Sequence, residues 1–279
     1  MYKMEKTIRQ ISRLRLGRPL WKLFASLAVI LTLGVTPVLA EETTAELDLE
    51  ARAILMEMAA FISRVPAFSV TLRSAYDAIQ EDGQYIEFGE RRHVLLQRPD
   101  QLRVETERSD GEHNLVLFDG DKITGFKADD NIFAQVEKPG TIDETLIYLV
   151  RDLQFKLPLA RMLHTGFAQQ LEKMITAVSY VEENVLFDVV TDHLAVRAEN
   201  IDMQLWVAQG DEPLPRRIVI TYMNAPGQPQ FRGDFTDWSI EPKVAADSFT
   251  FTPPADAEKV PVIARVREKG SIPAQKGGE

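Results

Sequence analysis

The sequence predicts a single α+β domain in which an antiparallel sheet is interrupted by a helical insertion. Three observations predict this class. Short segments of strand-like composition are separated by turn pairs such as Asp119-Gly120 in the first half of the chain. The apolar spacing changes to every third or fourth residue near Thr141, and strand-like segments resume after Met174. Because strands and helices do not alternate one by one, a parallel doubly wound sheet is not expected.

The first half of the domain is predicted to be one helix followed by hairpins. Apolar residues recur at helical spacing from Glu41 to Val65, and Pro66 ends the run. A helix packed on its own sheet explains this stripe more simply than a helix that binds a partner. The predicted strands that follow are "FSVTLRSAYDAI", "QYIEFGERRHVLLQ", "QLRVETER", "HNLVLF", "KITGFK" and "IFAQV".

The helical insertion begins at Thr141, which forms a capping box with Glu144, and Pro158 breaks the first helical run. A second helical stretch, "LARMLHTGFAQQLEKM", is predicted to bend near Gly166. The predicted strands that resume after it are "TAVSYVEE", "VLFDVVTDHLAVRA", "IDMQLWVA", "RRIVITYM", "FRGDFTDWSI" and "SFTFTP". The Pro-, Gly- and Lys-rich residues 265–279 are predicted to be a disordered tail.

Residues 1–40 are predicted to be a cleaved secretory signal. Up to Lys22 they carry seven basic side chains and one acidic side chain, and the uncharged run "LFASLAVILTLGV" follows. Pro37 and the small residues that end at Ala40 complete the pattern. The alternative is a membrane anchor, but a spanning helix needs about 20 apolar residues. The mature protein is therefore expected to be one domain, residues 41–264, in the periplasm or outside the cell.

Charge and cysteine content exclude several classes of partner. The chain has 32 basic and 42 acidic side chains, and the part after residue 40 keeps 25 and 41 of them, a formal net charge of −16. Such a surface repels the phosphate backbone of a nucleic acid, so no nucleic-acid partner is expected. Because the chain has no cysteine, it lacks disulfides, thiol nucleophiles and sulfur ligands for zinc. The mature protein is also expected to be soluble and not a lipoprotein.

No local motif of catalysis or metal binding is present. The chain lacks the serine-hydrolase elbow, the phosphate-binding glycine loop and the helical zinc motif. The four histidines are far apart in the sequence: His93, His113, His164 and His193. Asp119 and Asp121 begin a calcium-loop pattern, but Ile123 occupies the third ligand position, so a hairpin turn is predicted instead. We expect no enzymatic activity, no metal site and no cofactor.

The segment "MQLWVAQGDEPLPRRIVITY" (203–222) is predicted to be two consecutive strands joined by a turn. Gly210 tolerates positive φ, and Pro213 fixes its own φ, which suits a connection. The charged residues of the segment are predicted to form a solvated rim and not an active site: Asp211, Glu212, Arg216 and Arg217.

Many predicted strands are apolar on both faces. In "HNLVLF", Leu115 and Leu117 point one way, whereas Val116 and Phe118 point the other way. An antiparallel sheet with one solvated face should alternate cleanly between apolar and polar residues. Two arrangements fit: either helices cover one face and leave a lipid-sized cavity beneath them, or both faces are packed core.

Nine stretches between about residues 45 and 255 carry a family resemblance. They are "RPDQLRV" (98–104), "LFDGDKIT" (117–124), "KPGTIDETL" (138–146), "KLPLARML" (156–163), "DHLAVR" (192–197), "LWVAQGDEPLPRRIVITY" (205–222), "PGQPQF" (226–231), "FTDWSIEP" (235–242) and "FTFTPP" (249–254). In these stretches the chain resembles a family of predicted periplasmic proteins of unknown function, which is similar to the LolA-like lipoprotein-carrier fold. The resemblance implies an incomplete antiparallel β-barrel with helices plugging its concave face. It supplies no catalytic residues.

These observations predict a non-enzymatic periplasmic protein that binds or carries a lipid, a lipoprotein or another hydrophobic ligand. One alternative is an envelope sensor or interaction module with a membrane protein as its partner, and another is a hydrolase whose site is dispersed along the chain. For the leading hypothesis, large apolar residues are expected to line the ligand cavity. The candidates are Phe118, Phe126, Phe133, Met162 and Trp206.

Overall fold

The computed structural model describes residues 38–153 and 159–261 of the 279-residue chain. The predicted tail (265–279) and the predicted signal up to residue 37 lie outside the described residues. Within the described part, no helix is both long enough and apolar enough to cross a bilayer.

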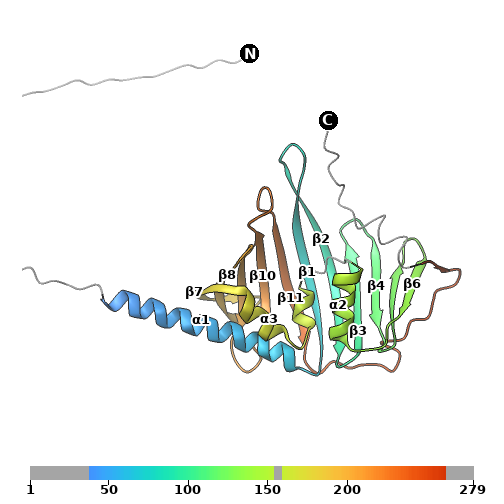
Figure 1. Ribbon diagram of the computed structural model, residues 1–279, viewed down its shortest axis with the longest axis horizontal. Helices are drawn as coiled ribbons and strands as arrows, with labels where there is room; N and C mark the ends of the chain where they lie inside the picture. Colours follow the sequence, from blue (N-terminus) through green and yellow to red (C-terminus); the bar gives the residue numbers. More distant parts are fainter. Residues whose placement is uncertain (1–37, 154–158, 262–279) are drawn as a thin grey trace, which may run out of the picture. The chain divides into compact units, whose positions relative to one another are not determined.

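One sheet of twelve strands organises the described residues, with the strand order β12-β6-β5-β4-β3-β2-β1-β11-β10-β9-β8-β7 (Figure 1). Neighbouring strands are antiparallel except for β12 and β6, which are parallel. The pairing of β1 with β11 joins the first six strands to the later ones. The strands are β1 (Ala67–Ile79), β2 (Tyr85–Gln97), β3 (Gln101–Arg108), β4 (His113–Phe118), β5 (Lys122–Lys127), β6 (Ile132–Glu137), β7 (Ile175–Leu186), β8 (Val189–Ala198), β9 (Ile201–Ala208), β10 (Pro215–Tyr222), β11 (Gln230–Ser239) and β12 (Glu258–Lys259).

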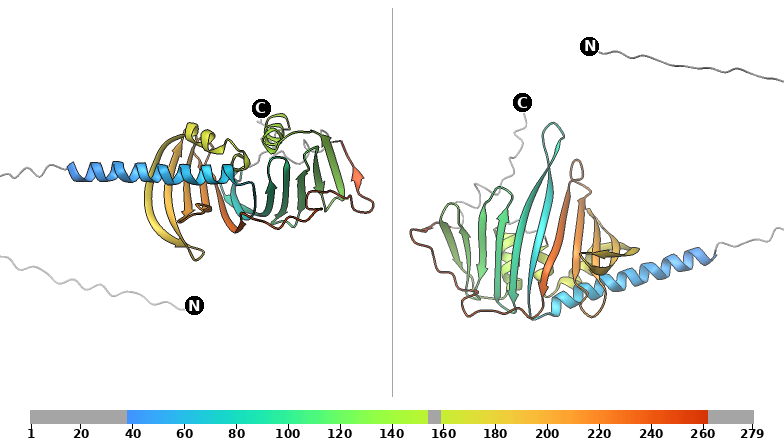
Figure 2. Two further views of the ribbon diagram at one scale, coloured as in Figure 1. Left: turned by 90° about the horizontal axis from the view of Figure 1, so that it is seen from below. Right: turned by 180° about the vertical axis from the view of Figure 1, so that it is seen from behind.

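The helices all lie on one side of the sheet, which curves around them and does not close (Figure 2). We call this side the inner face and the opposite side the outer face. The helices are α1 (Val38–Arg64), α2 (Ile142–Ile147), the π-helix η1 (Tyr148–Asp152), the 3₁₀-helix η2 (Ala160–Leu163) and α3 (Phe167–Met174). The α+β fold class and the incomplete antiparallel barrel with helices on its concave face are confirmed.

Side chains from the helices and the inner face form one continuous buried cluster. Helix α1 contributes residues three and four positions apart, as an amphipathic helix should. They include Ala51, Leu55, Met58 and Ile62. The strands contribute inner-face residues such as Leu72, Leu96, Leu194 and Phe235. Beneath the helices, therefore, the inner-face side chains are buried.

Local side-chain hydrogen bonds explain two of the element boundaries. The side chain of Asp119 accepts hydrogen bonds from the backbone N–H groups of Asp121 and Lys122, at 3.0 and 2.8 Å. This turn joins β4 to β5, which confirms the predicted hairpin. At the start of α2, Thr141 and Glu144 form the predicted capping box.

Three of the predicted elements were wrong, one in its boundary and two in their structure. Helix α1 begins at Val38, three residues before the predicted start. The predicted strand at residues 185–198 is two strands, because Phe187 and Asp188 both adopt positive φ and make a tight turn between β7 and β8. The segment "SFTFTP", which was predicted to be a strand, does not form a strand. Its backbone forms turns such as that from Asp247 to Thr250, and the ring of Phe251 packs onto Phe126 and Phe133 on the outer face.

Candidate functional site

A row of charged and aromatic residues crosses the outer face from β3 to β8. Each member is the direct cross-strand partner of the next, so the side chains share one face of the sheet. We call it the outer row. It consists of Glu107, Arg91, Arg73, Asp234, Arg217, Trp206 and His193.

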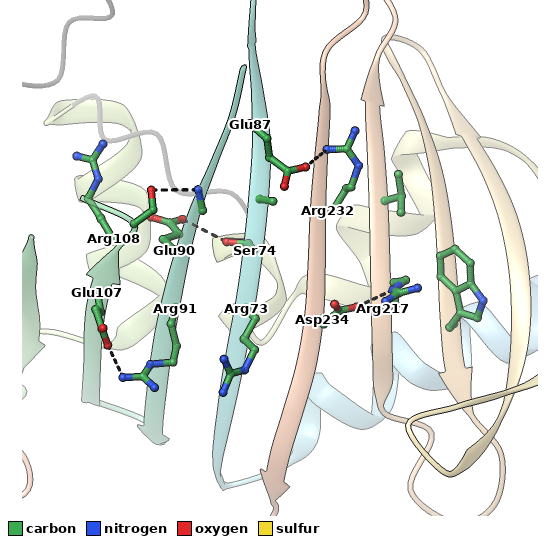
Figure 3. A pocket seen from close by; sticks show the side chains of 15 residues that line it. Arg73, Ser74, Glu87, Glu90, Arg91, Glu107, Arg108, Arg217, Arg232 and Asp234 are labelled. Carbon is green, nitrogen blue, oxygen red and sulfur yellow. Dashed lines mark hydrogen bonds and ion pairs between the residues drawn. The ribbon is translucent and has the colours of Figure 1, made fainter. Parts of the chain in front are cut away.

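All members of the outer row except His193 line a pocket of about 640 Å³ (Figure 3). Its floor includes two small residues, Ala75 and Gly89, which are cross-strand partners on β1 and β2. Arginine side chains from the neighbouring strands rise around them. A shallow depression therefore forms on a surface that would otherwise be flat.

The acidic side chains of the pocket are engaged by arginines. Asp234 accepts a hydrogen bond from Arg217 Nε at 2.6 Å, and Glu107 is paired with Arg91. Arg73 lies between these two pairs in strand order. Within the described part of the chain, its guanidinium makes no hydrogen bond or ion pair. The centre of the row thus holds an exposed guanidinium that lies beside Asp234 but is not bonded to any described residue.

Aromatic rings form one end of the outer row. The rings of His193 and Trp206 are stacked, with their centroids 4.0 Å apart and their planes 10° apart. The guanidinium carbon of Arg217 lies 5.8 Å from the Trp206 ring and 5.6 Å from the Phe187 ring, which are cation–π distances. Gln204 lies 3.1 Å from His193 Nε2 and fixes the imidazole. Trp206 is therefore held in place beside a cation.

The predicted hairpin at residues 203–222 is confirmed by the antiparallel pairing of β9 and β10. Asp211 and Glu212 lie exposed in its turn, as a rim should. Arg217 does not belong to that rim, because it lies within the outer row. Arg216 is half-buried, and its Nε is buried without a hydrogen-bond partner in the described structure. The prediction that all four charged residues form a solvated rim was therefore wrong for Arg216 and Arg217.

A second row crosses the inner face and is apolar throughout. It runs over six strands from β2 to β8, and each residue is again the cross-strand partner of the next. We call it the inner row. It consists of Phe88, Tyr76, Phe231, Ile220, Met203 and Val196.

The inner row is buried at its β8 end and open at its β2 end. Phe231 is 2% exposed, whereas Phe88 is 39% exposed and stacks on Tyr76 with the ring centroids 5.9 Å apart. Two residues further toward the strand ends, Ile86 and Tyr222 are each 37% exposed on the same face. The β1–β2 hairpin projects beyond the helices (Figure 1). An apolar surface thus continues from the core into a region that the described helices leave uncovered.

The five predicted ligand-lining residues lie in three different places. Phe118 and Met162 belong to the buried cluster beneath the helices. Phe126 and Phe133 lie on the outer face, where both rings contact Phe251 at centroid distances of 5.6 and 5.4 Å. Trp206 is part of the outer row. The structure does not bring the five together around one cavity, and their role in ligand binding stays a prediction.

Sequence reasoning missed Arg73, Arg91 and Phe88. Each lies in a predicted strand without any motif around it. Alternation within the strand could have placed each residue on a face, but only the pairing of β1 with β2 and β11 shows which residues meet. Among the described residues, no group of three histidine or acidic side chains is arranged to hold a metal ion.

Comparison with known proteins gives one family match and several distant structural similarities. A model of the family described as "Predicted periplasmic protein (DUF2092)" matches residues 51–263. The lipoprotein LppX of Mycobacterium tuberculosis is 13% identical, with a TM-score of 0.45 over 71% of this chain and 98% of that chain. A LolA superfamily protein from Nitrosomonas europaea is 14% identical, with a TM-score of 0.35 over 72% of this chain and 97% of that chain. No curated protein matches the chain.

Proposed function

The chain belongs to the DUF2092 family of predicted periplasmic proteins, and we propose that in the periplasm it is a non-enzymatic protein that binds or carries a hydrophobic ligand. The ligand is a lipid or the acyl part of a lipoprotein. It binds along the inner row, at the end that the described helices leave uncovered.

The observation that carries this proposal is the exposed β2 end of the inner row. Phe88 at this end, with Ile86 beside it on β2 and Tyr222 on β10, exposes a large apolar side chain on the inner face, next to the buried core. An acyl chain suits such a track, because each buried methylene contributes about 0.8 kcal/mol and needs no polar partner. Because the inner-face side chains beneath the helices are already buried, the proposed position of the ligand is beside the helical layer and not under it.

We expect lipid to copurify with the protein. The test is to isolate the mature protein from the periplasm under native conditions and to analyse its organic extract by mass spectrometry. A lipid present in stoichiometric amount supports the proposal. A protein that is empty after gentle isolation, and that takes up no fatty acid or phospholipid when these are added, contradicts it.

Replacing Phe88 by aspartate should reduce lipid retention at least tenfold without unfolding the protein. The side chain is 39% exposed, so a charge at this position remains hydrated while it interrupts the apolar track. Retention is measured by mass spectrometry of the extract, and folding by the midpoint of thermal unfolding.

The matched control for Phe88→Asp is Leu49→Asp. Leu49 lies on α1 with 70% of its surface exposed, so the change also introduces a charge at an exposed apolar position. Retention by Leu49→Asp should equal that of the wild type. Equal losses in both variants would show that the inner row is not the binding surface.

A further inference from the structure

We propose that the outer-face pocket is a binding site for a phosphate group, held by Arg73 and Arg91. The proposal does not depend on the proposed function, because the pocket lies on the opposite face of the sheet from the inner row. The phosphate group belongs either to a free small molecule or to a lipid headgroup, and these two sources share the same chemistry at the site.

The first argument is the juxtaposition of two arginines. Arg73 and Arg91 are direct cross-strand partners on β1 and β2, and their side chains extend in the same direction (Figure 3). Like charges that lie directly opposite each other on a sheet are destabilising. Glu107 is paired with Arg91, and Asp234, the cross-strand partner of Arg73 on β11, is bonded to Arg217, so the Arg73 guanidinium makes no hydrogen bond or ion pair within the described residues. An anion that bridges the two guanidinium groups would remove this repulsion.

The second argument is the shape of the surface around the pair. Both arginines line the 640 Å³ pocket, whose floor contains Ala75 and Gly89. The small residues leave room for an anionic group above the sheet, next to the arginine forks. A solvated arginine on a flat sheet would have no such depression beside it.

The third argument is the number of donors. A carboxylate offers two oxygens and is satisfied by one guanidinium fork, whereas a phosphate group offers three oxygens to more than one arginine. Two adjacent forks therefore fit phosphate better than carboxylate. Trp206, which lines the same pocket, offers a rigid apolar surface to the organic part of a phosphate ester.

The test is isothermal titration calorimetry of the mature protein with inorganic phosphate and with glycerol 3-phosphate. Sedimentation with vesicles of phosphatidylglycerol, compared with vesicles of phosphatidylcholine, tests the headgroup. We expect saturable binding of at least one probe: inorganic phosphate, glycerol 3-phosphate or phosphatidylglycerol vesicles. Arg73→Gln should bind that probe at least tenfold more weakly. Binding of the soluble probes assigns a free phosphate compound, whereas Arg73-dependent binding to phosphatidylglycerol vesicles alone assigns a lipid headgroup.

The control variant is Arg197→Gln, which removes the same charge from an exposed arginine outside the pocket. It should bind as the wild type does. Thermal unfolding provides a second readout: without phosphate Arg73→Gln should be at least as stable as the wild type, and the binding ligand should raise only the wild-type midpoint. No saturable binding in any arm, equal binding by Arg73→Gln, or equally tight binding of acetate would overturn the proposal.

Discussion

Replacing Arg98 by methionine is expected to lower the free energy of unfolding by about 3 kcal/mol. The Arg98 guanidinium donates to three backbone carbonyls: Nε to Val65 at 3.1 Å, Nη1 to Leu163 at 2.8 Å and Nη2 to Ile62 at 3.3 Å. Ile62 lies in the last turn of α1, Val65 directly follows that helix, and Leu163 is the last residue of η2. Burial lowers the pKa of Arg98, and the nearby Asp143 carboxylate opposes that shift. One side chain thus fastens two helices to the end of β2.

The size of the loss in stability follows from the backbone carbonyls that Arg98→Met leaves without a donor. Methionine keeps the apolar stem but removes every donor, so carbonyls at the end of α1 lose their charged partner, and a lost hydrogen bond to a charged group costs about 1.5–3 kcal/mol. Cations near a helix C-terminus also interact favourably with the helix dipole. Urea unfolding measures the change, and hydrogen exchange should show lost protection at the end of α1.

Arg52→Met is the control for Arg98→Met. Arg52 lies on α1 itself, but its side chain is 41% exposed and makes one ion pair with Glu172 at 3.3 Å. Exposed pairs contribute little to stability, so this change should leave the unfolding midpoint nearly unchanged. If the two variants lose similar stability, Arg98 is not the link between the helices and the sheet.

The parts of the fold that were predictable from the sequence are those set by local chemistry. The Asp119 turn and the capping box of Thr141 and Glu144 involve residues within three positions of each other. Gly166 is the residue before α3 and lies between η2 and α3, where the sequence predicted a bend. These signals need no knowledge of the rest of the chain.

The wrong predictions share a different cause. The β7–β8 turn could not be recognised from the sequence, because it lacks the Asn-Gly or Asp-Gly pair typical of such turns. Phe187 and Asp188 occupy its two positive-φ positions instead. Phe249 and Phe251 alternate as they would in a strand, yet their segment packs its side chains on the sheet without joining its hydrogen-bond ladder. Periodicity reports which side chains are buried, not what the backbone pairs with.

The candidate sites could not be predicted because they depend on register between distant segments. The outer row joins Arg91 on β2 to Arg217 on β10 through β1 and β11, and the inner row uses the same pairing. A one-residue shift in the register of β1 against β11 would move Arg73 away from Asp234 and place Leu72 on the outer face. The position of both proposed sites thus rests on this one pairing.

Asp77 stabilises the pairing of β1 with β11, so Asp77→Asn should lower the free energy of unfolding by about 2 kcal/mol at neutral pH. The Asp77 carboxylate accepts hydrogen bonds from the Gln230 backbone N–H at 2.9 Å and from Arg232 Nη1 and Nη2 at 2.9 and 3.2 Å. Its side chain is 11% exposed. It thereby continues the link between β1 and β11 beyond the last paired residues, Tyr76 and Phe231. Asparagine keeps the shape but loses the charge and one acceptor oxygen.

The pH dependence of that loss identifies its cause. The hydrogen bond from Arg232 lowers the pKa of Asp77, and this effect together with the Gln230 bond outweighs the opposing effect of burial. Because the folded pKa lies below the unfolded value of about 3.9, the carboxylate's contribution is complete above about pH 4 and is lost as the pH falls through the folded pKa. The stability difference between wild type and Asp77→Asn should therefore be constant near neutrality and shrink in acid.

Asp202→Asn, which breaks the exposed cross-strand pair with Arg197, should show little loss at any pH. A difference for Asp77→Asn that persists unchanged to pH 2 would mean that the carboxylate charge does not stabilise the pairing of β1 with β11.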